Sequence, residues 1–241
     1  MNKFLKHFSF SKKYPLEKNF VNFLFWFFVI LGIYLLISGS ESLFLDLRHQ
    51  ARFMGVFAFL SALFLTIPLI VYNNTRLSHL YNKHFIYLIE LLIGLSFLLD
   101  WLGNFALYRL INGYDSFAHF SVSLFLGNII FLSIFAFKGK RFRKRKFWIF
   151  LAIVVIIGLT GGLFWEGFEK LSDILFKTTI YGDIYFPDPY DTLKDIIYNL
   201  LGIVVSFIFS FYYFEKKIEE WRYGFIRSKI RRFKDLFKFR W

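Results

Sequence analysis

The stretch FWEGFE (164–169) closes one long apolar run, and the stretch DPYDTLKDIIYNLLG (188–202) opens the next. Both carry acidic residues beside hydrophobic ones. An acid at the end of a membrane span is costly unless it is paired, protonated or bound to a cation, so a group of such acids predicts a functional site. We therefore expect these two pieces to contribute side chains to one site.

The composition predicts a membrane protein. Of the 241 residues 57% are hydrophobic and 24% aromatic, yet the formal net charge is +13, which departs strongly from an average soluble domain. The apolar runs of about 18 to 22 residues each suffice to cross a hydrocarbon core of about 30 Å as a helix. The fold class is therefore an all-α, polytopic transmembrane bundle. The absence of cysteine excludes disulfides, thiolate metal sites and cysteine nucleophiles.

The apolar runs predict six spans. Their expected ranges are 20–38, 54–72, 85–102, 116–137, 147–168 and 192–214. The first run is longer than the apolar region of a secretory signal and is interpreted as a retained span. The chain then divides into a basic N-terminus (1–19), a membrane domain (20–214) and a basic tail (215–241).

The distribution of basic residues predicts a multi-pass protein of the cell membrane with both termini in the cytoplasm. Residues 1–19, 73–84, 138–146 and 215–241 hold 5, 2, 7 and 10 of the 30 lysines and arginines. Basic loops stay on the cytoplasmic side. We expect the loop 138–146 and the tail, read as an amphipathic helix, to contact anionic lipid headgroups. No nucleic-acid partner is expected.

Polar side chains gather at the predicted outer ends of the last four spans. They are Asp100, Asp115, His119, Glu166, Glu169, Asp188, Asp191, Asp195 and Asn199. Asp115 and His119 are four residues apart, as are Asp191 and Asp195, so each pair lies on one helix face. Stripes of this kind pointing inward would meet in a polar pocket between helices.

The charges at this outer rim favour a cation. Nine acids stand against four basic residues there. Oxygen ligands with one imidazole and no sulfur suit a divalent cation, with Mg²⁺, Mn²⁺ or Ca²⁺ favoured over Zn²⁺. The candidate ligands are Asp115, His119, Glu166, Glu169, Asp191 and Asp195. Glu166, Asp191 and His119 are also the candidate catalytic residues, with Asp100, Asp188 and Asn199 as further polar pocket residues.

Several simpler interpretations stay open. Asp115 and Asp191 suit helix starts as caps, and His119 could simply hydrogen-bond a carboxylate. Four glycines of the last two spans suit close helix packing. Glu90, inside the third span, is either a carboxyl held by a neighbouring helix or part of an ion or proton path.

The motifs resemble a known family. YDSFAHF (114–120), WEGFE (165–169) and the Asp, Asn and Gly series of 188–202 are similar to the VanZ-like superfamily, and closer to its YjdF-like branch, over about 100–210. Ser116 replaces a lysine frequent in VanZ itself, and Glu169 replaces a glutamine, as in the YjdF-like branch. The resemblance implies a cell-envelope setting and names no reaction.

Three hypotheses follow for the function. The first is a membrane protein of the cell envelope with an acidic pocket for a metal ion, which as an enzyme would act on lipid headgroups or lipid-linked envelope precursors. The second is an ion- or proton-coupled transporter that uses Glu90 and the outer acids. The third is a structural membrane protein without catalysis.

Overall fold

The computed structural model describes residues 15–41, 45–81, 83–138, 147–176 and 190–210, and this part of the chain is almost entirely helical, with a few turn residues and no strands. Six long helices form the bundle: α2 (Leu16–Glu41), α3 (Leu45–Asn74), α5 (Lys83–Leu102), α7 (Tyr114–Lys138), α9 (Phe147–Phe176) and α10 (Asp191–Phe209). All six are long and apolar enough to cross a membrane. The predicted fold class is therefore confirmed.

Two connections differ from the sequence prediction. The charged residues of 39–53, between the first two predicted spans, predict a short interfacial turn, but α2 continues to Glu41 and α3 already begins at Leu45. The fifth helix continues to Phe176 rather than ending near 168, because the following residues contain no proline or glycine to stop it. The acids of 164–169 thus lie inside a helix. The end of the sixth predicted span, the basic tail, Asp188 and most of the loop 138–146 lie outside the described residues.

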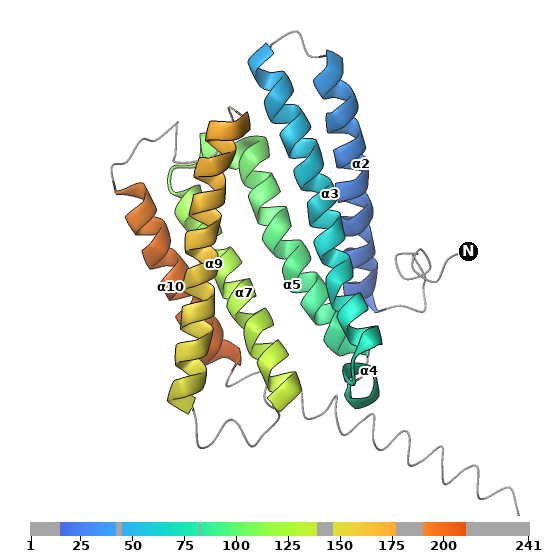
Figure 1. Cartoon of the computed structure of the whole chain (residues 1–241), viewed down its shortest axis with the longest axis vertical. Helices are drawn as coiled ribbons and strands as arrows, with labels where there is room; N and C mark the ends of the chain where they lie inside the picture. Colours follow the sequence, from blue (N-terminus) through green and yellow to red (C-terminus); the bar gives the residue numbers. More distant parts are fainter. Residues whose placement is uncertain (1–14, 42–44, 82, 139–146, 177–189, 211–241) are drawn as a thin grey trace, which may run out of the picture.

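The long helices alternate in direction, so the outer ends of the last four meet at one end of the bundle (Figure 1). The first described helix starts, and the last one stops, at the opposite end (Figure 1). This agrees with an even number of spans. The cytoplasmic side of the termini stays a prediction from the basic residues.

The bundle is built from two tightly packed helix pairs joined by α5. The pair α2 and α3 and the pair α7 and α10 have the most extensive contacts, and α5 packs against α2, α3 and α7. One apolar core, with Leu24, Phe28 and Trp101, lies between α2, α3 and α5. A second, with Phe131 and Ile203, lies between α5, α7, α9 and α10.

Helices α7 and α10 approach each other closely at Gly202. A Cβ atom at this position would collide with the backbone carbonyl of Phe120. One turn away, the hydroxyl of Ser123 donates a hydrogen bond to Oδ1 of Asn199 at 2.6 Å. A glycine that permits backbone contact and polar side chains that bridge helices are common means of association in membranes. These contacts fix the register of α10 against α7.

The chain between α5 and α7 is irregular. A π-helical segment, η1 (Gly103–Leu107), continues α5, and the short helix α6 (Tyr108–Leu110) follows. Gly113 then turns the chain with a φ of +82°, which favours glycine. Single π-helical turns are frequent at functional sites. Here the segment returns Tyr108 toward the end of α5.

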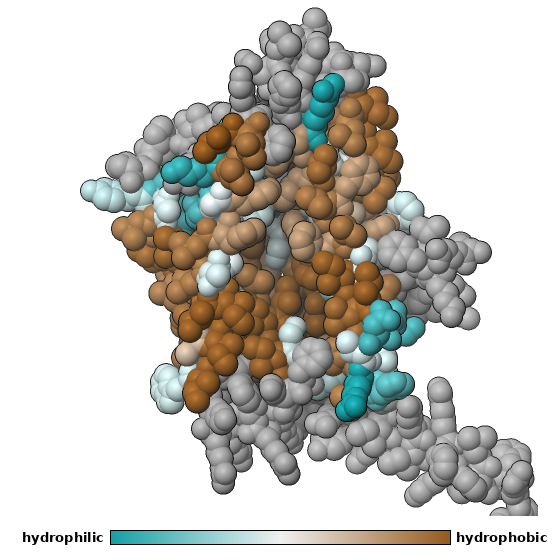
Figure 2. Space-filling view, viewed as in Figure 1, coloured by the Kyte–Doolittle hydropathy of each residue, from teal (hydrophilic) through white to brown (hydrophobic). Residues whose placement is uncertain are grey.

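The surface carries a broad apolar band. Figure 2 shows hydrophobic residues around the middle of the bundle, with hydrophilic residues near its upper and lower ends. Large exposed side chains of α2, α3 and α9 such as Ile30, Leu63 and Ile156 belong to the exposed apolar surface. A patch of this extent is unusual for a soluble monomer and suits contact with lipid.

One basic residue of the predicted N-terminal segment lies inside the bundle. Lys18 is buried in the first turns of α2, and its Nζ lies 3.6 Å from Oε2 of Glu90 on α5. It also lies 5.3 Å from the ring centre of Tyr87. Of the two alternatives for Glu90, a carboxyl held by a neighbouring helix matches this arrangement, in the form of an ion pair. We call these two residues the Lys18–Glu90 pair.

Candidate functional site

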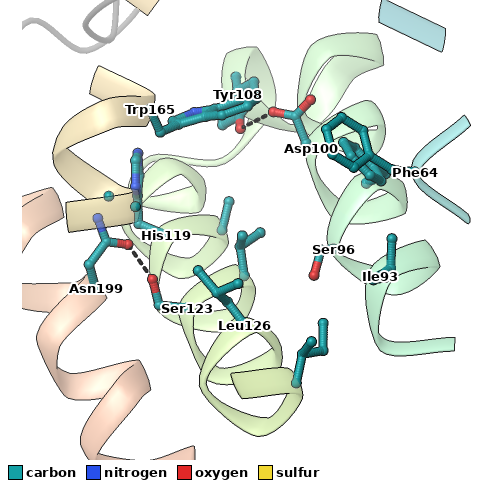
Figure 3. A pocket seen from close by; sticks show the side chains of 16 residues that line it. Phe64, Ile93, Ser96, Asp100, Tyr108, His119, Ser123, Leu126, Trp165 and Asn199 are labelled. Atoms are coloured by element: carbon teal, nitrogen blue, oxygen red, sulfur yellow. Dashed lines mark hydrogen bonds between the residues drawn. The ribbon is translucent and has the colours of Figure 1, made fainter. Parts of the chain in front are cut away.

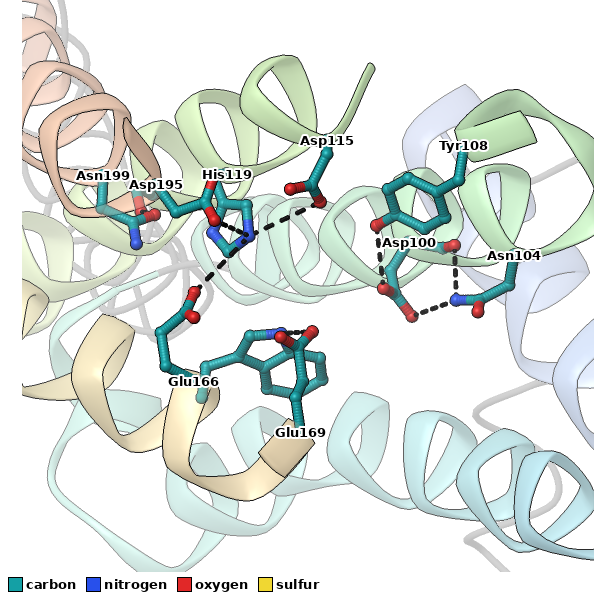
Figure 4. Close-up of polar contacts among 11 residues, drawn as sticks. Asp100, Asn104, Tyr108, Asp115, His119, Glu166, Glu169, Asp195 and Asn199 are labelled. Atoms are coloured by element: carbon teal, nitrogen blue, oxygen red, sulfur yellow. Dashed lines mark hydrogen bonds and ion pairs between the residues drawn. The ribbon is translucent and has the colours of Figure 1, made fainter. Parts of the chain in front are cut away.

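Three carboxylates surround one imidazole nitrogen at the predicted outer end of α7. Nε2 of His119 lies 3.6 Å from Oδ1 of Asp115, 3.7 Å from Oε1 of Glu166 and 3.8 Å from Oδ2 of Asp195. Figure 4 shows the three acids converging on this nitrogen from α7, α9 and α10. We call these four residues the His119 cluster. The sequence predicted all four as ligands, and the fold brings them together.

The distances within the His119 cluster are close to those of atoms that share a metal ion. They exceed the usual range of an N–H···O hydrogen bond. Two ligand atoms about 2.1 Å from one ion would lie roughly 3.4 Å apart at a tetrahedral angle. Ligand atoms of Asp115, His119 and Asp195 all lie within 4.8 Å of one another. A small shift of the side chains would therefore bring them to bonding distance from one cation.

Two acids of the cluster are buried without full hydrogen bonding. Glu166 is 8% exposed and Asp195 is 3% exposed. Oε1 of Glu166 and Oδ1 of Asp195 have no hydrogen-bond partner among the described residues. In that part of the chain the only ion-pair contacts of these two carboxylates are with His119. A buried polar atom without a partner costs about 1–3 kcal/mol, so a bound cation would relieve a real penalty.

Two other predicted ligands lie apart from the cluster. The carboxylate of Glu169 pairs with Trp165 instead, because its Oε1 accepts a hydrogen bond of 2.6 Å from the indole nitrogen (Figure 4). Asp191 is the first residue of α10, one helical turn from Asp195 toward the outer end, and is only partly buried. Four of the six predicted ligands therefore form the His119 cluster.

Asp100 belongs to a second polar group. Its carboxylate accepts hydrogen bonds from the phenol of Tyr108 at 3.4 Å and from the amide of Asn104 at 3.3 Å (Figure 4). Burial and the neighbouring carboxylates, Asp100 first among them, raise the pKa of Tyr108 well above its ordinary value of 10.0. Tyr108 therefore stays protonated at neutral pH and acts as a donor.

Several residues around the site could not be predicted from the sequence. Tyr108 and Asn104 come from the irregular connection after α5, where no periodic pattern exists. Ser123 was one serine among several in an apolar helix, although it is the hydrogen-bond donor to the predicted pocket residue Asn199. Its position one turn after His119 was the available signal.

A cavity of about 350 Å³ adjoins the His119 cluster on its α5 side. Figure 3 shows His119 and Asn199 on one side of the cavity and Asp100, Tyr108 and Trp165 at its upper end. Its remaining lining is mostly apolar and comes from α3, α5, α7 and α9. The volume falls at the lower end of the range of small-molecule pockets, about 300–1,000 Å³. We call this the central cavity.

Comparison with known proteins gives one match, which covers most of the chain. The model of a family described as predicted membrane protein (DUF2238) matches residues 23–216. No curated protein and no solved structure matches the chain significantly. The matched range includes all six long helices for most of their length and every residue of the His119 cluster. The chain therefore belongs to the DUF2238 family of predicted membrane proteins.

Proposed function

We propose that this membrane protein binds a divalent cation in the His119 cluster and uses it on a phosphate-bearing headgroup at the extracytoplasmic face of the cell envelope. One observation carries the proposal: a single imidazole nitrogen faces three carboxylates at 3.6 to 3.8 Å, at the predicted outer end of the bundle. The VanZ-like and YjdF-like motifs of 100–210 support the envelope setting. The burial of the acids supports a bound ion.

The proposed ligands come from three helices. Asp115 and His119 of α7 and Asp195 of α10 would hold the ion on a rigid helix pair, and Glu166 of α9 would complete the set. A headgroup phosphate would bind only through the ion, because the carboxylates alone repel an anion. The cation would polarise the phosphoryl oxygen as a Lewis acid. Asp191, one turn outward, would act as acid or base.

The donor set favours a hard or borderline cation. Three carboxylates suit Mg²⁺, Mn²⁺ or Ca²⁺, and one imidazole is accepted by Mn²⁺ more readily than by Mg²⁺ or Ca²⁺. We expect Mn²⁺ to bind more tightly than Ca²⁺, because the four ligands are fewer than the 6–8 that Ca²⁺ takes.

Elemental analysis of the purified full chain in lipid nanodiscs tests the proposal. After loading with Mn²⁺ and desalting, wild type should retain about one ion per chain, and Asp195→Asn and Glu166→Gln should lose it. Glu169→Gln is the matched control, because it removes an acid from the same helix as Glu166 but outside the cluster. Retention of the ion by Asp195→Asn and Glu166→Gln, or equal loss in the control, would contradict the proposal.

The complete burial of the ionisable Glu90 inside a span is the observation that supports a second candidate function, transport coupled to ions or protons. Glu90 lies in the other half of the bundle, roughly 15 Å along α5 from Asp100. Apolar residues of α5, among them Ile93 and Phe97, lie between the two groups along the helix. Proteoliposomes would decide: proton or Mn²⁺ flux that is abolished by Glu90→Gln supports transport, and no flux above protein-free vesicles rejects it.

A further inference from the structure

The central cavity is polar at one end and apolar at the other. Asp100, Tyr108 and His119 lie toward the outer end, and Ile93, Leu126 and Ile129 lie toward the middle of the bundle (Figure 3). His119 belongs to both the cavity lining and the His119 cluster, so the cavity and the cluster adjoin each other at this side chain. A ligand that fills both must have a polar group attached to an apolar body.

The depth of the cavity matches one leaflet of a bilayer. Along α7 its lining extends from His119 to Ile129, a rise of about 15 Å at 1.5 Å per residue. The hydrocarbon core of a bilayer is about 30 Å thick, so this is about half of it. The polar end lies at the outer end of the span, where the headgroups of the outer leaflet would be. The apolar end lies near the bilayer midplane.

The cavity also reaches the lipid-facing surface. Phe64 of α3 lines it and is 46% exposed, so the wall at this point is in contact with the bilayer. On the opposite side, Gly161 and Gly162 of α9 contribute no side chain, and a Cβ at Gly161 would touch only Leu126, at 3.5 Å. Helix α9 is also the least buried of the six spans. Helices α3 and α9 are in contact nearer their predicted outer ends through Phe57 and Trp165, so a lipid chain would enter below this contact, where Gly161 adds no side chain.

From these observations we propose that the central cavity holds an acyl chain of a phosphoglycerolipid from the outer leaflet, with the lipid phosphate at the cation of the His119 cluster. The phosphate part rests on the proposed function, whereas the chain part rests on the cavity alone. The protein then recognises its ligand by two separate features, a charged headgroup and an apolar chain. A soluble phosphate compound supplies only the first.

Photolabelling of the full chain in nanodiscs tests the acyl-chain site. The probe is phosphatidylglycerol with a diazirine in the middle of one acyl chain, and adducts are mapped by mass spectrometry. In wild type we expect adducts on cavity residues such as Leu126 and Ile129, as well as on residues of the lipid-facing surface such as Ile156. Gly161→Leu should reduce the cavity adducts several-fold and leave the adducts on the lipid-facing surface unchanged, because the new leucine side chain fills the space beside Leu126.

The matched control is Gly167→Leu. Gly167 lies on the same helix, and a Cβ there would meet nothing within 4 Å, so the substitution adds the same bulk away from the cavity. Cavity adducts should be as abundant in this variant as in wild type. Adducts confined to the lipid-facing surface in wild type would overturn the proposal, and this result does not depend on the folding of any variant. Equal cavity labelling of wild type and Gly161→Leu would overturn it as well.

Metal analysis of the same samples separates the two proposals. An ion retained without cavity adducts would reject the acyl-chain site and leave the cation site standing. Cavity adducts without any ion would reject the cation site and the phosphate part, and support the chain part. A diacylglycerol with the same labelled chain tests the headgroup: we expect it to label the cavity several-fold less than phosphatidylglycerol when Mn²⁺ is present. Equal labelling by both would reject the role of the phosphate.

Discussion

The Lys18–Glu90 pair and the His119 cluster are both buried between helices, but they are balanced differently. In the first, one carboxylate meets one ammonium group at 3.6 Å. In the second, three carboxylates share one imidazole. The first group can be neutral with partners that the chain itself supplies. The second has more carboxylates than basic groups and needs protons or a cation to become neutral, and this excess is the basis of the proposed cation site.

The largest effect on this comparison should come from breaking the balanced pair. Lys18→Met leaves Glu90, which is completely buried, without its ammonium partner. Removing one member of a buried ion pair typically costs about 3–5 kcal/mol. We expect a loss of this order in the free energy of unfolding, measured by reversible denaturation in mixed micelles.

The double variant Lys18→Met/Glu90→Leu is the control, because two apolar side chains replace the pair without leaving a charge. It should recover most of the lost stability. If the single and double variants are equally unstable, the pair stabilises the bundle by packing and not by charge balance.

The second largest effect should be a gain in stability, and it should depend on added cation. Mn²⁺ at about 100 times its dissociation constant should raise the free energy of unfolding of wild type by about 2.7 kcal/mol. Asp195→Asn should abolish this increase, whereas without cation it should be no less stable than wild type, because it removes a crowded buried acid. Thermal unfolding with and without Mn²⁺ measures both. A strong loss of stability in the cation-free variant would favour a purely structural cluster.

A smaller effect should follow from loosening the helix pair that carries the cluster. Ser123→Ala removes the 2.6 Å hydrogen bond to Asn199 and leaves a buried amide oxygen without this donor. The expected cost is about 1–3 kcal/mol. Because α7 and α10 carry three of the four ligands, Mn²⁺ affinity should fall with stability. Ser96→Ala, which loses only a bond to its own helix backbone, should change neither Mn²⁺ affinity nor stability as much.

The smallest effect on stability should appear at alkaline pH and come from Tyr108 of the second polar group. The raised pKa of Tyr108 means that the folded chain keeps a proton which the unfolded chain releases above about pH 10. Its contribution to stability is therefore complete below pH 10 and lost as the pH rises toward the higher folded pKa. Tyr108→Phe should flatten this alkaline decline and cost about 1 kcal/mol at neutral pH. An unchanged alkaline decline would assign it to other groups.

The sequence was sufficient for the fold because apolar length determines it. Six runs predicted six spans, and each corresponds to a helix. It failed where length carries no information. Lys18 was counted with the solvated N-terminal lysines because nothing local shows that α2 begins at Leu16 and that Glu90 faces it. The helical segments within 39–53 were missed because charged residues there resemble a loop.

The site was predictable to the extent that helix periodicity determines it. Asp115 and His119, spaced by four, do face one point with Asp195. Glu169, spaced by three from Glu166, turns aside because the indole of Trp165 holds it. The central cavity and Tyr108 depend on the irregular segment η1 and on packing between distant helices. Such features are properties of the assembled bundle and not of any one stretch.

The order of the ligands along the chain has a consequence for biogenesis. Asp115 and His119 are translated first, Glu166 comes next, and Asp195 follows in the sixth of the described spans. Gly202, which lets this sixth helix lie against α7, comes after it. Until that span has inserted and docked, the earlier acids lack Asp195 as a neighbour. On the proposed function, cation capture would therefore be a late maturation step, and a chain truncated before Asp191 should insert into the membrane yet mature without the ion.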